Sequence, residues 1–173
     1  MSHQTAALPI AYVVLRILIV LNWVFAALVL GLLAFTFVSE AWTMRALGVA
    51  GMADAQQVMW GMRAVAALGV AAAPFNHLIL KRLLAMVETV RAGDPFVADN
   101  AYRLHAIAWL LLAIQLISMT IGGIGKAIST PEHPFHLDAG FSVPGWLAVL
   151  LSFILARVFA EGTLMREELE GTV

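Results

Sequence analysis

The first long apolar stretch of the chain, residues 10–38, limits its fold more than any other feature. This stretch carries one formal charge, Arg16, and is otherwise almost entirely hydrophobic. A helix needs about 20 mostly apolar residues to cross the roughly 30 Å hydrocarbon core of a bilayer. Arg16 lies close to the start, where a long side chain can reach back to the interface. The stretch therefore predicts a membrane-spanning helix.

Three further stretches have the same property. Spans are expected at residues 59–80, 101–121 and 145–160, and the second helix is expected to continue to residue 91. Composition agrees, because 62% of the 173 residues are hydrophobic and 12% are charged, against roughly 45–50% and about 25% in soluble domains. The sequence predicts an all-α fold, a polytopic membrane four-helix bundle forming one transmembrane domain over residues 1–173.

Local patterns predict how these helices bend and end. Pro74 inside the second span predicts a kink, because proline removes a backbone hydrogen bond. Gly93, which precedes an Asp-Pro pair, is expected to end the extended second helix. Asp99 or Asn100 is predicted to cap the third helix. The polar segment 39–57 is expected to form a short loop with a turn of helix.

Basic residues near the ends of the spans predict the orientation. One side of the membrane, with the two termini and the loop 81–103, has seven basic residues: Arg16, Lys81, Arg82, Arg91, Arg103, Arg157 and Arg166. The opposite side has three: Arg45, Arg63 and Lys126. Because the side richer in Lys and Arg stays in the cytoplasm, we expect both termini there. The loop 81–103 and the tail 161–173 are then cytoplasmic as well.

The cytoplasmic loop and the tail contain similar short patterns. Each has a glycine, then an apolar residue, then an acid at matching positions. The aligned pairs are Gly93 with Gly162, Phe96 with Met165, and Asp99 with Glu168. The match predicts a tandem repeat of two helical hairpins in the same orientation, each ending in a glycine turn. A chance match of this length is the alternative.

The same patterns resemble those of the DUF2975 family of small bacterial membrane proteins. Gly93 to Asn100 matches a G-x-x-F-x-x-[DE]-N segment, and Gly162 to Glu168 matches a G-x-x-L-x-x-E motif before a Thr-Val-like ending. Met165 stands where leucine is usual, and Leu169-Glu170 replaces asparagine-aspartate. The resemblance implies a four-helix protein of the bacterial inner membrane with no established reaction. Such proteins are often encoded beside a small helix-turn-helix regulator, which implies an anchor or sensor for a cytoplasmic partner.

The residues that we expect to bind this partner lie in the two motifs. They are Gly93, Phe96, Asp99, Asn100, Gly162, Leu164, Met165 and Glu168. Among them the apolar side chains stand in otherwise polar segments, so we expect them to dock against the helices or against the partner. The alternative function is a small transporter or exporter subunit with a cavity near Pro74, Asn76 and His77. Asn22, Asn76 and Gln115 are expected to hydrogen-bond between helices, and small residues in the spans allow a homo-oligomer.

Enzymatic and cofactor chemistry is not expected. Nucleophile elbows, phosphate loops and His-Glu-x-x-His helices are absent from the sequence, and without cysteine thiolate chemistry is excluded. His77 and His105, near the ends of spans, are weak candidates for haem ligands. A net charge of −1 gives no basis for direct binding of nucleic acid.

The loop between the third and fourth spans holds a weak candidate metal site. His133 and His136 are three residues apart, and Glu132 and Asp138 add carboxylates. Imidazole and carboxylate groups are ordinary metal ligands. The commoner interpretation is a solvated polar loop, and no metal or other cofactor is predicted.

Overall fold

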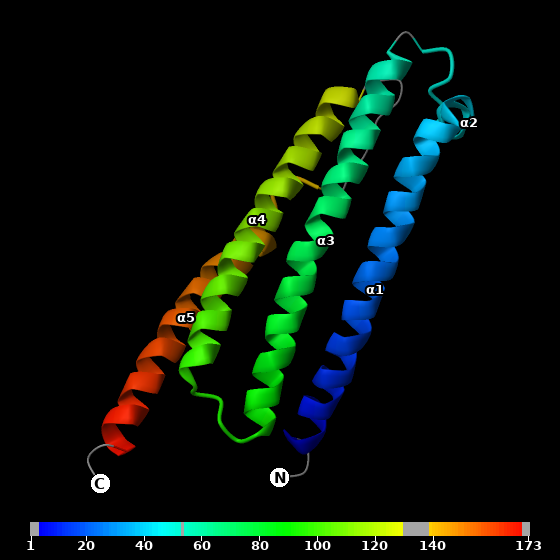
Figure 1. Cartoon of the computed structure of the whole chain (residues 1–173). Coiled ribbons are helices and arrows are strands. Elements are labelled where there is room, and N and C mark those ends of the chain that lie inside the picture. Colours follow the sequence, from blue (N-terminus) through cyan, green and yellow to red (C-terminus); the bar gives the residue numbers. More distant parts are fainter. Residues whose placement is uncertain (1–3, 53, 130–138, 171–173) are drawn as a thin grey trace. The chain divides into compact units, whose positions relative to one another are not determined.

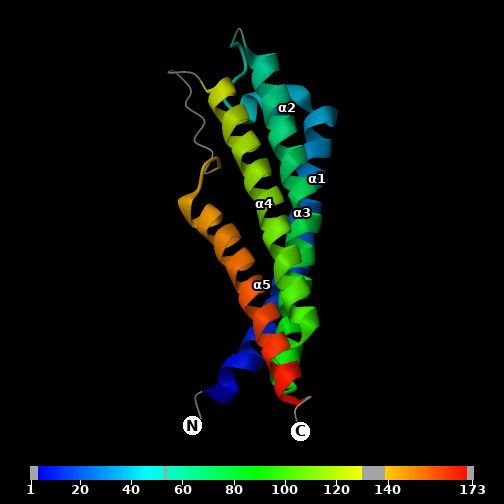
Figure 2. The same cartoon turned by 90° about the vertical axis from the view of Figure 1, so that its left-hand side faces the viewer.

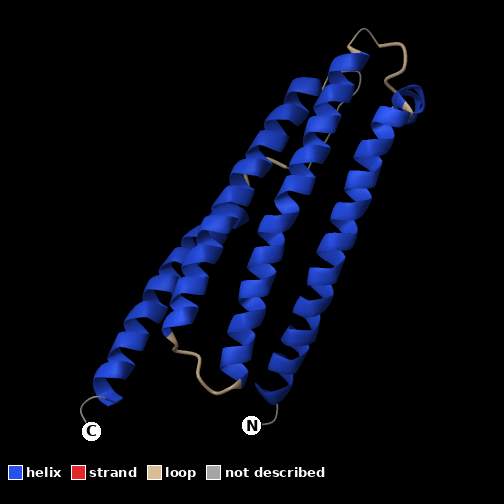
Figure 3. Ribbon diagram, in the orientation of Figure 1, coloured by secondary structure: helices blue, strands red, loops and turns tan. Residues whose placement is uncertain are grey.

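A computed structural model of the protein describes residues 4–52, 54–129 and 139–170. These residues form the helices α1 (Gln4–Val38), α2 (Glu40–Ala46), α3 (Ala55–Arg91), α4 (Ala98–Ile128) and α5 (Val143–Glu170), labelled in Figure 1. No strand occurs in the described ranges, as Figure 3 shows. All except α2 are long and apolar enough to cross a membrane. The predicted all-α fold with four spans is confirmed.

Helix α1 shows the surface of a lipid-facing helix. Its large apolar side chains are mostly exposed, among them Ile10, Phe25 and Leu32. In water this exposure would be costly, but lipid tails solvate apolar side chains as well as a protein core does. Most of the buried apolar side chains lie instead on α3 and α4, such as Ala73 and Ala108.

Residue contacts divide the chain into two compact units. Unit 1 comprises Met1–Asn22, Pro74–Ala113 and Val143–Val173, and unit 2 comprises Trp23–Ala73 and Ile114–Ser142. Helix α5 belongs entirely to unit 1. The seven basic residues assigned to the cytoplasmic side all fall in unit 1, and the other three fall in unit 2. The contacts thus separate the same two groups of charges that the orientation argument uses.

Within unit 1 the first turns of α1 and the last turns of α5 lie at the same end as the turn between α3 and α4, as Figures 1 and 2 show. The ring of Tyr12 lies 4.8 Å from the Arg16 guanidinium and 5.0 Å from that of Arg91. Because Tyr12 is four residues before Arg16, the arginine reaches back toward the start of α1, as predicted for a charge near a span's end.

The turn after α3 has the geometry that its glycine predicts. Gly93 has φ +85°, a conformation that only glycine adopts without strain. Its N–H donates to the Val90 carbonyl at 3.1 Å, and the Asp94 N–H donates to the Thr89 carbonyl at 3.1 Å. These bonds satisfy the last carbonyls of α3. The prediction that the helix ends here is confirmed.

The start of α4 differs from the prediction. The helix begins at Ala98, so Asp99 and Asn100 lie inside its first turn and neither is the cap. The Asn100 N–H donates to the Val97 carbonyl at 2.9 Å. The capping prediction was wrong because the Asn100 side chain is buried and makes other bonds.

The glycines near the end of α4 do not end the helix. The helix continues through Gly122 to Ile128, beyond the predicted end at residue 121. A β-carbon on Gly122 would collide with the backbone of Ala139 and Gly140. Glycine is needed there because another stretch of backbone approaches the helix closely.

Two polar side chains fasten the same stretch of backbone to α4. The buried Gln115 donates through Nε2 to the Gly140 carbonyl at 3.4 Å, and the Gly140 N–H donates to Ser118 Oγ at 3.2 Å. Gln115 therefore bonds to another segment, as expected for a polar group at membrane depth. Its partner is the backbone just before α5 and not a second helix.

Helix α5 runs without interruption past the predicted span. It extends from Val143 to Glu170, and the expected span 145–160 lies within it. Gly162 lies inside it, so the prediction of a second glycine turn was wrong. Helix α3 continues through Pro74, and the kink predicted there stays a prediction.

Candidate functional site

The two motifs found in the sequence contact each other in unit 1. The Phe96 ring lies against Gly162, where an added β-carbon would be 3.0 Å from the Phe96 Cδ1 atom. The rings of Phe96 and Phe159 also pack together, with centroids 5.4 Å apart. Arg166 donates a hydrogen bond to the Asp94 carboxylate and forms an ion pair with it. The turn 92–97 is therefore docked on the last turns of α5.

Asn100 fixes the shape of the docked turn. Its side chain is fully buried, and its Nδ2 group donates to Thr89 Oγ1 at 2.7 Å and to the Pro95 carbonyl at 2.9 Å. Its Oδ1 atom accepts a hydrogen bond from Arg103 at 2.8 Å. A buried amide that lost these partners would pay a desolvation cost. Asn100 thus acts inside the protein, linking the end of α3, the turn and α4.

Other predicted partner-binding residues keep exposed surface. Leu164 and Met165 are 59% and 60% exposed, and Phe96 is 43% exposed although its ring packs on α5. Asp99 forms an ion pair with Arg103 at 3.2 Å and is otherwise open to solvent. Glu168 is exposed on the last turn of the described part of α5. The residues available to another molecule are thus mainly on α5.

Helical spacing separates the docked side of α5 from its exposed side. Side chains three, four and seven residues apart lie on one side of a helix. The residues facing the turn have this spacing: Phe159, Gly162, the buried Thr163 and Arg166. Leu164 has none of these spacings from Gly162 or Arg166 and points away from that face, whereas Met165, three residues after Gly162, lies at its edge; both side chains are exposed. They form an exposed apolar pair that the turn does not cover.

The surroundings of this pair are rich in acids. Glu161, Glu167 and Glu168 are exposed on the same helix end. Arg157 pairs with Glu161 at 2.7 Å, and Arg166 is engaged by Asp94. A cavity of about 250 Å³ lies where the turn meets α5, and Asp94, Thr163 and Glu167 are among its lining residues. The helix end offers apolar contact within a mainly acidic surface.

Arg63, in unit 2, is a structural residue that sequence reasoning missed. It is 5% exposed, and its Nη2 atom donates to the Thr36 carbonyl at 2.7 Å and to Glu40 at 3.4 Å. Its guanidinium also lies 4.2 Å from the Phe37 ring centroid and 5.0 Å from that of Trp60. The arginine therefore binds the last turn of α1 to α3. Its proximity to Trp60 in the sequence was the available signal.

The metal candidates Glu132, His133, His136 and Asp138 lie outside the described residues, so the metal site in this loop stays a prediction. Within the ranges that the structure covers, no group of three or more His, Cys, Asp or Glu side chains is arranged to hold a metal ion. His105 accepts a hydrogen bond at Nε2 from Trp109 at 3.1 Å.

Comparison with known proteins agrees with the motifs. No curated protein and no solved structure matches the chain. A family model described as a protein of unknown function, DUF2975, matches residues 42–173. The matched region runs from α2 to the end of the chain and includes both docked motifs. The chain belongs to the DUF2975 family, as its two glycine motifs predicted.

Proposed function

We propose that this membrane protein is a non-enzymatic anchor or sensor that holds a soluble, basic cytoplasmic protein through the exposed side of α5. The observation that best supports this proposal is the exposure of two apolar side chains, Leu164 and Met165. Both are exposed by more than half on the helix end against which the turn is docked. Exposed apolar residues with a polar rim mark interaction surfaces. Exposed apolar side chains on a helix can bind in a groove of a partner.

The partner's charge follows from the rim of this surface. Arg157 pairs with Glu161, so the exposed acids Glu167 and Glu168 are the ones that favour a partner with a basic face, because complementary charges speed encounter and suppress wrong pairings. Proteins that bind DNA carry such a basic face. A small helix-turn-helix regulator, the partner class implied by the family resemblance, fits this surface. Held by the acidic helix, its basic face would be unavailable to DNA.

The docked turn supports this proposal because it holds the helix end in place. Phe96 and Asp94 bind one side of α5, so its last turns are ordered before a partner arrives. A preorganised surface loses less conformational entropy on binding than a flexible tail does. The cytoplasmic placement of this end rests on the distribution of basic residues.

The test is direct binding between two purified proteins. If the adjacent gene encodes a small helix-turn-helix regulator, that regulator would be titrated against the membrane protein in detergent micelles. We expect Leu164→Ala with Met165→Ala to weaken binding at least tenfold, and rising salt to weaken binding to the unchanged protein. Leu147→Ala is the matched control, since Leu147 is a similarly exposed leucine of the same helix in the apolar part of the span.

Equal binding by the double variant and the unchanged protein would show that the apolar pair is not the contact. If the unchanged protein does not bind the regulator, the proposal that it anchors such a regulator is wrong. Transport assays would then test the alternative of a small transporter or exporter subunit, beginning with substitutions at Asn76 and His77.

A further inference from the structure

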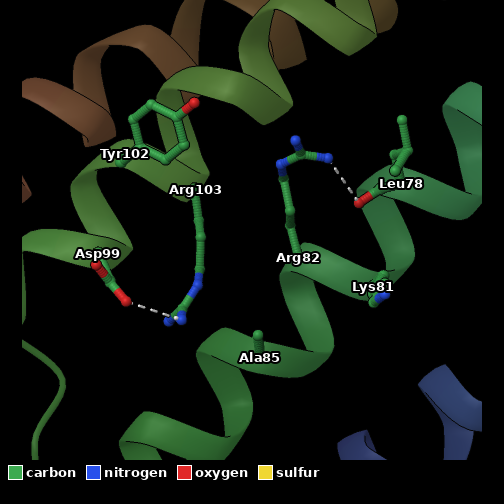
Figure 4. A pocket seen from close by; sticks show the side chains of 7 residues that line it. All are labelled: Leu78, Lys81, Arg82, Ala85, Asp99, Tyr102 and Arg103. Carbon is green, nitrogen blue, oxygen red and sulfur yellow. Dashed lines mark hydrogen bonds and ion pairs between the residues drawn. The ribbon is translucent and has the colours of Figure 1, made fainter.

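A second cavity of unit 1 is separate from the docked side of α5. It has a volume of about 500 Å³ and lies between the later part of α3 and the first turns of α4. Figure 4 shows the side chains around it. They are Leu78, Lys81, Arg82, Ala85, Asp99, Tyr102 and Arg103. Three of the seven are basic and one is acidic, so the lining carries two net positive charges.

Arg103 is held in a fixed position at one side of this cavity. Its Nη1 atom donates to Asn100 Oδ1 at 2.8 Å, and its Nη2 atom bonds the Asp99 carboxylate at 3.2 Å. The Arg103 side chain is 24% exposed, and Asn100 beneath it is fully buried. The guanidinium is thus positioned before any ligand binds. A guanidinium has five N–H donors, so two bonds leave others for an anion.

The two basic residues that α3 contributes to this cavity retain more of their donors. Arg82 donates through Nη1 to the Leu78 carbonyl in a long bond of 3.4 Å, and Figure 4 shows it across the cavity from Arg103. Lys81 is exposed and forms none of the ion pairs found among the described residues. Asp99 is engaged by Arg103, so it offsets one positive charge only.

The position of this cavity along the helices indicates where its ligand comes from. Lys81 and Arg82 directly follow the apolar part of α3, and Arg103 comes just before the apolar part of α4. Basic residues at such boundaries lie at the level of the lipid headgroups. Leu78 is exposed beside the charges, so an apolar chain can continue from the cavity along α3.

We propose that this cavity binds the phosphate group of an anionic phospholipid. Basic pockets between membrane helices on the cytoplasmic side bind such headgroups, and arginine donates paired hydrogen bonds to phosphate oxygens. The volume is within the roughly 300–1,000 Å³ of small-molecule sites. A soluble phosphate ester offers the same group without the acyl chains, and the experiment separates these sources.

The test measures the melting temperature of the purified protein in a neutral detergent with increasing ligand. The probes are phosphatidylglycerol, phosphatidylcholine and glycerol 3-phosphate. We expect phosphatidylglycerol to raise the melting temperature most, because only a ligand of the folded state shifts it. Lys81→Gln with Arg82→Gln should weaken the apparent affinity roughly 30-fold, since each basic residue near an anionic lipid surface contributes roughly a fivefold change in affinity.

Arg91→Gln is the matched control, because it removes a positive charge from the end of α3 without changing the lining. The proposal holds if the double variant alone loses the response. If glycerol 3-phosphate acts as strongly as the lipid, the phosphate site is supported and its ligand is soluble. Equal responses to phosphatidylglycerol and phosphatidylcholine, or equal losses in the double variant and in Arg91→Gln, would overturn it.

Discussion

Gly162 leaves room for the ring of Phe96, whose Cδ1 and Cε1 atoms would lie 3.0 Å and 3.2 Å from a β-carbon at that position. The two residues belong to different motifs. The glycine that resembled a turn signal therefore serves close packing within a helix. Its partner is the first aromatic residue after the other glycine.

Replacing Gly162 by leucine should displace Phe96 and undock the turn. The larger side chain would overlap the ring, and overpacking of this kind costs about 1–3 kcal/mol of unfolding free energy. The measurement is chemical unfolding in micelles. In a Phe96→Ala background the same substitution should cost clearly less, because the ring is gone. Equal costs in both backgrounds would mean that the two residues are not coupled.

Asn100→Ala should lower the unfolding free energy by about 2–3 kcal/mol, because it leaves buried partners of the amide without hydrogen bonds. Asn100→Asp should also destabilise, since a carboxylate cannot donate to the Pro95 carbonyl. Thermal melts compared with those of Asp99→Ala check this. The exposed Asp99 should contribute less than about 0.5 kcal/mol. An unchanged melt for both Asn100 variants would contradict the structural role.

Arg63→Met should destabilise the protein by about 2 kcal/mol, because the Thr36 carbonyl and Glu40 lose a charged donor. Arg63→Lys should be intermediate, since lysine keeps the charge but cannot donate in the same forked geometry. Unfolding followed by tryptophan fluorescence reports the change. Arg45→Met is the matched control, because Arg45 is exposed. If Arg45→Met lowers the unfolding free energy as much as Arg63→Met does, the loss comes from removing a positive charge in general and not from the contacts of Arg63.

Single cysteines test the orientation, since the natural sequence has none. Ala92→Cys, in the turn of unit 1, should resist a membrane-impermeant maleimide in intact cells and react in inverted vesicles. Ala50→Cys, in unit 2, should behave in the opposite way. The reason is the excess of basic residues on the side of the turn. The reverse labelling pattern would place the proposed docking surface outside the cytoplasm.

The spans were predictable because a bilayer imposes a minimum length of apolar residues. The turn at Gly93 was predictable because its positive φ demands glycine. The later parts of α4 and α5 were not, since a glycine that permits close packing looks the same in a sequence as one that ends a helix. Gly122 and Gly162 are both of the first kind.

The candidate site was predictable in its residues but not in its arrangement. The two motifs could be found by alignment, yet nothing in either motif indicates that Phe96 packs on Gly162. The burial of Arg63 was similarly hidden, because it depends on Thr36 and Glu40, which belong to other helices. Interactions between distant segments are decided by tertiary packing, which local patterns do not record.

The bond between Asp94 and Arg166 joins residues 72 positions apart in the sequence. Contacts between residues so far apart in the sequence form late in folding, after the chain between them has been brought into position. During synthesis, the turn has no partner until α5 has been made and inserted. A protein that recognised the docked turn and α5 together would therefore distinguish a completed chain from one still being assembled.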